Sequence, residues 1–130
     1  IAIIDQARNG MGCAIVHSDD AVGIQHLNQE AAKAMAAGNR AGYSISKAHA
    51  MKWITSNPAK AAGVLEHTGS IEAGKDADIV LWTHNPFSVY ARAQQVLIDG
   101  AVAYDMNDPK KQPITDFDLG IINPQINRVQ

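Results

Sequence analysis

The sequence is poor in cysteine, in aromatic residues and in net charge. Its single cysteine, Cys13, cannot form an internal disulfide, and no C-x-x-C spacing predicts a structural zinc site or a redox motif. A reducing, cytoplasmic environment is therefore expected. The formal net charge of -2 argues against nucleic-acid and anionic-membrane partners, which need clustered lysine and arginine. No apolar run reaches the roughly 20 residues that a membrane-spanning helix requires.

The composition is that of an ordinary folded protein. The chain has 130 residues, of which 46% are hydrophobic and 18% charged, enough for one core but not for two large domains. It opens on an apolar run at residues 1–4, with no initiator methionine and no helix cap. This opening leads us to expect a fragment of a longer protein.

The first half of the chain is predicted to be a strand followed by helices. Residues 13–16 are apolar without alternation, which is typical of a strand buried on both faces of a parallel sheet. Residues 3–9 are predicted to form the last turns of a preceding helix. Residues 25–37 have one apolar stripe, formed by Leu27, Ala31, Ala34 and Met35, and predict a helix that Gly38 ends.

Two shorter helices are expected next. One begins at Ser44 or Ser46 as the N-cap and runs through residue 54; the other begins at Asn57 as the cap, with Pro58 in its first turn, and closes at Gly63. Trp53 and Trp82 could be ligand platforms, but their helix and strand spacing favours a place in the core.

The second half is predicted to be mostly β. Residues 69–78 are turn-rich and lack the Walker pattern of a phosphate loop, so Gly74 is expected to adopt a positive φ while Lys75 and Asp76 are solvated. Ile79–Trp82 predicts a strand, and Asp99-Gly100 predicts a type I′ hairpin between residues 95–98 and 101–104. From residue 108 onward, an irregular tail is expected.

Polar residues follow the predicted strand at 13–16, in the order His17-Ser18-Asp19-Asp20. Parallel α/β folds place their active sites at such strand ends, and a carboxylate there could bind a divalent cation and accept a proton from water. The alternative is that Asp19 or Asp20 merely caps the helix that follows. Position alone favours the cap, since one carboxylate does not make a metal site.

Several downstream motifs occur in one order at compact spacing. They are Thr55-x-Asn57-Pro58-Ala59-Lys60, then Gly69-x-Ile71-Glu72-x-Gly74-Lys75-x-Ala77-Asp78-Ile79-Val80, then Asn85-Pro86-Phe87, and Val96-x-Ile98-Asp99-Gly100. Together they resemble the C-terminal region of the amidohydrolase superfamily, in particular imidazolonepropionases and the metal-dependent dipeptidases that act on proline-containing substrates. The resemblance extends to about residue 104.

The resemblance implies an α/β fold: a (β/α)8 barrel followed by a small β-sandwich, with one or two divalent metal ions, commonly Zn²⁺, at the barrel mouth. Residues 1–65 would then be the last strand and helices of the barrel, 66–108 part of the sandwich and 109–130 an irregular tail. It also implies that Asp19, at the end of the eighth strand, binds the metal and acts as the general base, with Asp20 as a cap or a supporting group. The substrate would be a small amide-type molecule whose C–N bond is hydrolysed.

The histidines complete the sequence-based expectations. His17 lies two residues before Asp19, so on a strand both point to one side, and His17 could contact substrate or tune Asp19; a satisfied barrel histidine is the alternative. The others are expected to be surface or packing residues: His26, His49, His67 and His84.

The resemblance places the remaining metal ligands on earlier strands, as a His-x-His pair, a bridging Lys or Glu and further histidines, so the isolated chain is expected to be inactive. A non-catalytic oligomerisation or scaffold module is the alternative, and a homo-oligomer is expected because a partial barrel and sandwich expose sheet edges.

Overall fold

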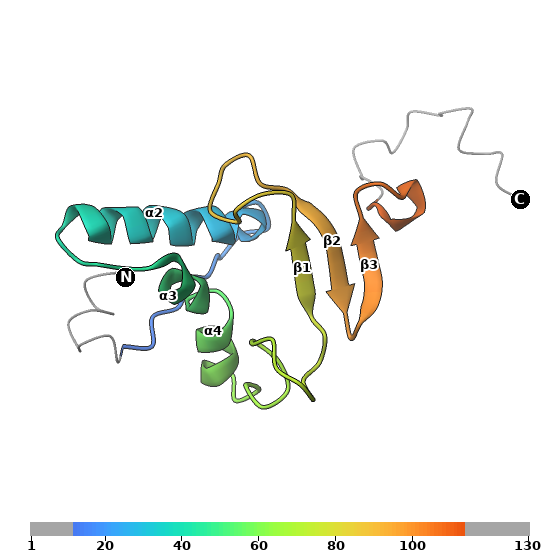
Figure 1. Cartoon of the computed structure of the whole chain (residues 1–130), viewed down its shortest axis with the longest axis horizontal. Coiled ribbons are helices and arrows are strands. Elements are labelled where there is room, and N and C mark those ends of the chain that lie inside the picture. The colour runs from blue at the N-terminus through green and yellow to red at the C-terminus, as the bar shows by residue number, and fades with distance from the viewer. Residues whose placement is uncertain (1–11, 114–130) are drawn as a thin grey trace, which may run out of the picture.

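Helices occupy the first half of the described chain and strands the second. The computed structural model describes residues 12–113. The helical elements are η1 (Gly23–His26), a 3₁₀ turn, followed by α2 (Leu27–Arg40), α3 (Lys47–Lys52) and α4 (Ser56–Ala61). The strands are β1 (Ile79–Trp82), β2 (Ala93–Ile98) and β3 (Ala101–Asp105), and the 3₁₀ turn η2 (Pro109–Lys111) follows them. Figure 1 shows the helices on one side of the molecule and the sheet on the other. The helix predicted over 3–9 and most of the 109–130 tail lie outside the described residues.

The core lies where α2 packs against α3 and the extended segment 12–18. The buried cluster comprises Val16, Ala31, Ile45, Ala50 and Trp53. All four residues of the predicted apolar stripe of α2 belong to this cluster or pack on it, which confirms the helical periodicity. Trp53 is fully buried and confirms the core interpretation of that tryptophan, whereas Trp82 on β1 is only half-buried.

The prediction that Gly38 ends the long helix is wrong. The helix continues through Gly38, which is buried, and ends at Arg40. The backbone N–H groups of Ala41 and Tyr43 both donate to the Gly38 carbonyl, at 3.0 and 3.1 Å. Gly42, with φ +95°, takes the left-handed conformation that ends the turn, so the sequence signal was right in kind but four residues early.

The short helices confirm one predicted cap and correct another. The Ser46 hydroxyl accepts a hydrogen bond from the His49 N–H at 3.1 Å, so Ser46 rather than Ser44 caps α3, which ends at Lys52. Asn57 does not cap α4, because Thr55 holds that position. The Asn57 side-chain amide instead donates to the Ala14 carbonyl at 2.7 Å, which joins α4 to the segment 12–18.

Residues 13–16 are extended but do not form the predicted strand. Within residues 12–113 the structure contains a single three-stranded sheet, and this segment is not part of it. Its backbone bonds to helices and their ends instead: the Val16 N–H donates to the Trp53 carbonyl at 3.0 Å. The apolar run therefore predicted burial only in part, since Val16 is 7% exposed but Cys13 is exposed, and it did not predict the absence of strand pairing.

The sheet has the order β1-β2-β3 and is antiparallel throughout. Ile98 pairs with Ala101 across the Asp99-Gly100 turn, where φ is +49° and +77°. Positive φ at both central residues is the signature of a type I′ turn and confirms the predicted hairpin. Helices beside an antiparallel sheet give a small α/β structure.

The turn-rich loop before β1 is held by a half-buried lysine. Gly74 has φ +91°, as predicted, and Asp76 is exposed. Lys75 is not solvated, however: its side chain is 13% exposed, and its ammonium donates to the Leu65 carbonyl at 2.6 Å and the Ser70 hydroxyl at 2.7 Å. The prediction failed because the loop curls around the ammonium and supplies oxygens that replace water.

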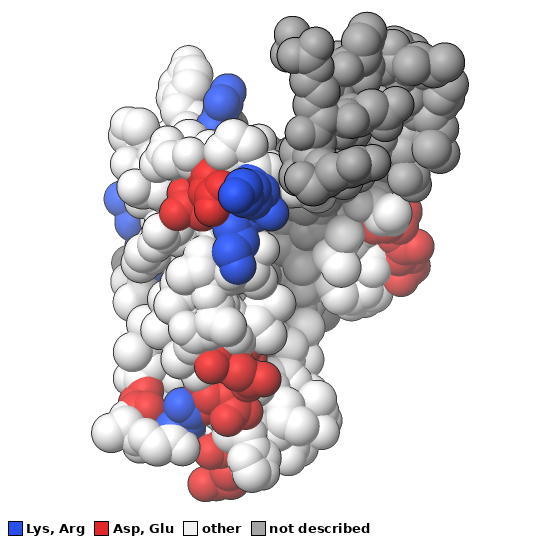
Figure 2. Space-filling model, turned by 90° about the vertical axis from the view of Figure 1, so that its right-hand side faces the viewer, with Lys and Arg blue, Asp and Glu red and all other residues white. Residues whose placement is uncertain are grey.

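The start of the tail is regular. Asp108 accepts a hydrogen bond from the Lys110 N–H at 3.0 Å and thereby caps η2, so residues 109–111 are not irregular as expected. The Lys111 ammonium donates to the Val102 carbonyl at 2.9 Å, which places η2 against β3. Figure 2 shows the side of the molecule that carries this region, where basic and acidic side chains lie next to one another in small groups among uncharged surface.

Candidate active-site segment

The polar residues His17 to Asp20 follow the buried Val16 and precede η1. Two bonds anchor the segment behind them, from the Val16 N–H to Trp53 and from the Asn57 amide to Ala14. Because α3 and α4 are fixed to the core by Ala50, Trp53 and Ala59, they hold this segment in place. The polar residues thus emerge at the surface from a firmly held extended segment, even though that segment is not a strand.

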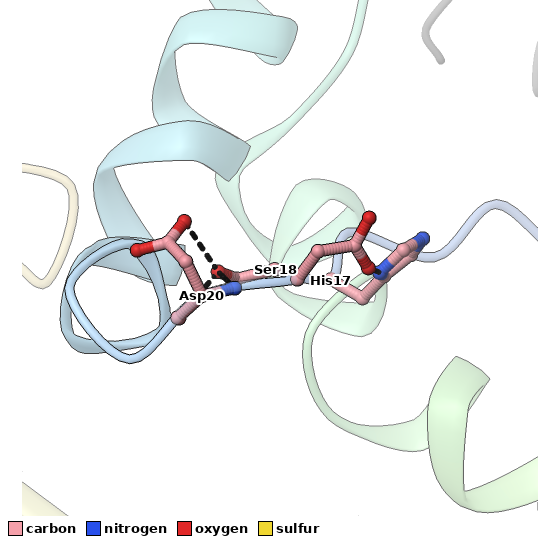
Figure 3. Close-up of polar contacts among 4 residues, drawn as sticks. His17, Ser18 and Asp20 are labelled. Atoms are coloured by element: carbon pink, nitrogen blue, oxygen red, sulfur yellow. Dashed lines mark hydrogen bonds and ion pairs between the residues drawn. The ribbon is translucent and has the colours of Figure 1, made fainter.

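His17 and Asp19 lie side by side at the surface. His17 Nδ1 is 3.5 Å from Asp19 Oδ1, and the two side chains are 74% and 95% exposed. The two-residue spacing therefore puts both on the same side, as an extended backbone requires. Figure 3 shows the imidazole and the neighbouring carboxylate pointing toward one another, away from the turn that Asp20 forms.

Asp20 has a different role, in the turn that starts η1. Its Oδ1 accepts hydrogen bonds from the N–H groups of Val22 at 2.8 Å and Gly23 at 2.6 Å. The Ser18 hydroxyl donates to the Asp20 carbonyl at 2.8 Å and accepts from the Asp20 N–H at 3.1 Å (Figure 3). Asp20 thus caps the turn at residues 20–23 through its side chain, as the sequence suggested, although Val22 occupies the N-cap position of η1 itself.

The hydrogen bonds to Asp20 also stabilise its charged form. The Gly23 N–H, and next the Val22 N–H, lower the pKa of the Asp20 carboxyl below its ordinary value. The turn is tight as well, since a Cβ added at Gly23 would lie 2.7 Å from both Asp20 Oδ2 and Ser18 Oγ. The two adjacent carboxylates are therefore distinguished by geometry: Asp20 is occupied by the backbone, and Asp19 is available.

Replacing Asp20 with alanine is expected to lower the free energy of unfolding at neutral pH, because the Val22 and Gly23 N–H groups lose their acceptor. A carboxyl whose pKa is lowered by folding contributes stability above its unfolded pKa and loses it as the pH falls through the folded value. The variant should therefore show a smaller loss of stability on acidification than the wild type. Urea denaturation at several pH values measures this. Asp19→Ala is the matched control and should behave as the wild type; an equal loss in both variants would contradict the assignment.

The side chains of this segment offer some, but not all, of the ligands of a metal site. A carboxylate and an imidazole are ordinary zinc ligands, and neither Asp19 nor His17 is bonded to a backbone N–H within residues 12–113. The same described range contains no group of three or more His, Cys, Asp or Glu side chains placed to hold a metal ion. The pair fits a metal ion as part of a ligand set and not as the whole of one.

The other histidines lie away from this segment's chemistry. His49 packs edge-on against Trp53, with ring centroids 5.9 Å apart, and His84 Nδ1 lies 3.0 Å from the Thr83 hydroxyl. His26 and His67 are exposed. The expectation that these four are surface or packing residues is confirmed.

Sequence reasoning missed two further features. Asn57 was expected to be a helix cap, but its side-chain amide holds the candidate segment through the Ala14 carbonyl. The sequence signal for this residue was its place in the motif that contains Asn57-Pro58. A hollow of about 390 Å³ also lies between the start of α2 and the sheet, with Arg92 and Trp82 among its lining residues. No motif in the sequence pointed to that hollow.

Comparison with known proteins assigns the class of this chain. The model of the family described as "Amidohydrolase family" matches residues 2–110. The chain is 34% identical over 96 residues to Amidohydrolase tasK of Hapsidospora irregularis, covering 74% of this chain and 9% of that protein. It is 43% identical over 71 residues to the urease subunit alpha of Clostridium perfringens, covering 50% of this chain and 12% of that one. The chain thus spans about a tenth of the length of these relatives.

A solved structure agrees with the sequence matches. The crystal structure of an amidohydrolase from Thermotoga maritima MSB8 superposes with a TM-score of 0.62 at 31% identity, over 80% of this chain and 26% of that one. The chain belongs to the amidohydrolase family. The members of this family are hydrolases, and membership implies a divalent metal ion.

Proposed function

We propose that this chain is the C-terminal portion of a metal-dependent amidohydrolase, in which Asp19 is the metal-site carboxylate and the general base. One observation carries the proposal. Of the two adjacent carboxylates, Asp20 accepts two backbone hydrogen bonds, while Asp19 is 95% exposed and lies against the His17 imidazole. The family match supports the proposal, because the members of this family are hydrolases and the family implies a divalent metal ion.

The proposal includes an assignment of the chain's parts. Residues 1–65 are the end of the (β/α)8 barrel, 66–108 part of the small β-sandwich and 109–130 a tail. Two features support it: the helices α2 to α4 precede an antiparallel sheet, and the segment before Asp19 is buried at Val16. In this assignment residues 13–16 pair as the eighth strand only when the rest of the barrel lies beside them.

The residues of this chain have defined tasks in hydrolysis. When bound, a divalent ion, in our proposal Zn²⁺, supplies a water of lowered pKa and polarises the scissile carbonyl. Asp19 takes the proton from the attacking water and returns it to the departing nitrogen. In the complete site His17, with Nδ1 3.5 Å from Asp19 Oδ1, orients that carboxylate or contacts the substrate; in the isolated chain its imidazole is also free to bind zinc beside Asp19. The substrate in this account is a small molecule with an amide-type C–N bond, cyclic or proline-containing.

A zinc measurement on the chain tests whether it holds only part of the site. Because the pair offers two ligands and structural zinc takes four, the chain is expected to retain well below one equivalent of zinc after dialysis and to hydrolyse no amide substrate. Inductively coupled plasma mass spectrometry measures the retained zinc. One full equivalent of retained zinc together with hydrolysis would contradict the partial-site account.

Among the helices of residues 12–113, none has the length and apolar character of a membrane span.

A second candidate function, a non-catalytic scaffold that forms homo-oligomers, is favoured by the exposed edge of the sheet. η2 and Lys111 lie against β3, whereas β1 is an uncharged strand whose Val80 and Leu81 are 41% and 47% exposed. Uncharged, apolar edge strands pair with other chains. Light scattering from micromolar to millimolar concentration is expected to show a dimer or larger assembly, and Leu81→Lys should reduce it. A monomer at all concentrations would contradict self-association.

A further inference from the structure

A hollow of about 390 Å³ lies between the sheet and the segment formed by η1 and the start of α2, and neither His17 nor Asp19 lines it. One wall is formed by Gln25, His26 and Gln29, and the other by Trp82, Arg92 and Tyr104. The volume lies within the range of roughly 300 to 1,000 Å³ that is typical of small-molecule sites.

Both walls are held in place. The Asn28 side chain, 7% exposed, donates to the Pro86 carbonyl at 2.6 Å and joins the start of α2 to the loop between β1 and β2. The Arg92 backbone is fixed to Thr83 by two bonds, from the Thr83 N–H to the Arg92 carbonyl at 3.0 Å and from the Arg92 N–H to the Thr83 hydroxyl at 3.1 Å. The backbone on both sides of the hollow is therefore fixed before any ligand binds.

The polar lining is rich in donors and contains no acid. Arg92 is the one permanently charged residue of the lining, and no lining residue is a carboxylate. Within residues 12–113, the Arg92 guanidinium, the Trp82 indole N–H and the Tyr104 hydroxyl have no hydrogen-bond partner in the protein. Arg92 is exposed and Trp82 and Tyr104 are half-buried, so their donors are open to solvent and available to an anion.

The other part of the lining is apolar. The Trp82 ring, Val89 and the methyl groups of Ala91 and Ala93 provide a surface that an inorganic anion leaves unused. A guanidinium binds a carboxylate through two parallel hydrogen bonds, and an indole offers a face to a flat ring. The ligand that satisfies both halves has a carboxylate at one end and an apolar ring at the other.

The geometry points to a second, non-catalytic ligand site in this hollow that binds small aromatic carboxylates, with Arg92 as the carboxylate-binding residue and Trp82 as the wall against the ring. The site is independent of the metal chemistry proposed for Asp19. Ligand bound there joins α2 to the sheet, the two halves of the described chain.

An NMR titration of the ¹⁵N-labelled chain tests the site. Benzoate is the probe, benzamide its neutral counterpart and phosphate the anion without a ring. Benzoate is expected to shift the Trp82 Nε1–H and Arg92 Nε–H signals with a millimolar dissociation constant, at least about tenfold tighter than either control, because a charged hydrogen-bond pair is lost in benzamide and the ring contact in phosphate.

Two exposed arginines provide matched variants. Arg92→Gln is expected to weaken benzoate binding by about tenfold or more, and Arg40→Gln, at the far end of α2, to leave it unchanged. Spectra of both variants report whether the fold is kept, and Tyr104→Phe should weaken binding by a smaller factor. Equal binding of benzoate and benzamide, equal binding of benzoate and phosphate, or an unchanged affinity in Arg92→Gln would each overturn the site.

Discussion

Replacing Gly69 with alanine is expected to lower the free energy of unfolding by about 2–5 kcal/mol. Gly69 has φ +92°, and an added Cβ would lie within van der Waals overlap of the Ala59 Cβ on α4 and 3.3 Å from the Thr55 carbonyl. A left-handed conformation costs an alanine roughly 1–2 kcal/mol, and overpacking costs about 1–3 kcal/mol more. Urea denaturation followed by circular dichroism measures the loss.

Gly74→Ala separates the two causes. Gly74 has nearly the same φ, +91°, but no atom lies within 4 Å of its added Cβ, so only the conformational cost of roughly 1–2 kcal/mol should remain. Adding Ala59→Gly to Gly69→Ala should recover part of the loss, because it removes the clashing methyl group. Equal losses at Gly69 and Gly74 would contradict the close packing of the loop on α4. That packing matters for the site, since α4 also carries Asn57, which holds the candidate segment.

Trp53→Ala is the second large effect, with an expected loss of about 3–5 kcal/mol in the free energy of unfolding. Trp53 is the largest fully buried side chain of the described residues, and its carbonyl accepts the Val16 N–H. Its removal empties the centre of a small core in which Ala31 and Ala50 leave no larger side chain to fill the space, and Val16 and Ile45 are the other buried members. This loss is a large part of the roughly 5–15 kcal/mol that stabilises a typical domain.

Two tryptophan variants serve as controls for that prediction. The Trp53 indole N–H has no hydrogen-bond partner within residues 12–113, so Trp53→Phe forfeits no bond and should cost much less than alanine. Trp82→Ala removes the same side chain from a half-buried position on β1 and should also cost less. A Trp53→Phe variant as unstable as Trp53→Ala would contradict a role based on packing alone. Thermal unfolding by circular dichroism ranks the three variants.

The sequence correctly predicted those elements whose conformation is set by residues that are neighbours along the chain. The Asp99-Gly100 pair specifies its hairpin because few residues accept positive φ in succession, and Ser46 caps α3 because its hydroxyl is suited to an N-terminal N–H. The apolar stripe of α2 likewise reports a face that the core covers.

What sequence reasoning could not supply depends on contacts between distant segments. Asn57 is a good cap in isolation, yet its amide bonds to Ala14, which is 43 positions away. Lys75 is buried by oxygens that the loop brings around it. The Asp19 and Asp20 carboxylates are identical by composition, and only the turn at Val22 and Gly23 shows which one is bound to the backbone.

A zinc titration of the ¹³C- and ¹⁵N-labelled chain tests the central claim most directly, with the Asp19 carboxyl carbon and the His17 imidazole nitrogens as the observed signals. The wild type and Asp20→Asn are expected to show saturable shifts of both groups at weak affinity, since two ligands are available. Asp19→Asn should abolish the His17 shift while leaving the rest of the spectrum unchanged. Undiminished zinc binding in Asp19→Asn, or its loss in Asp20→Asn alone, would contradict the assignment of Asp19 as the metal-site carboxylate.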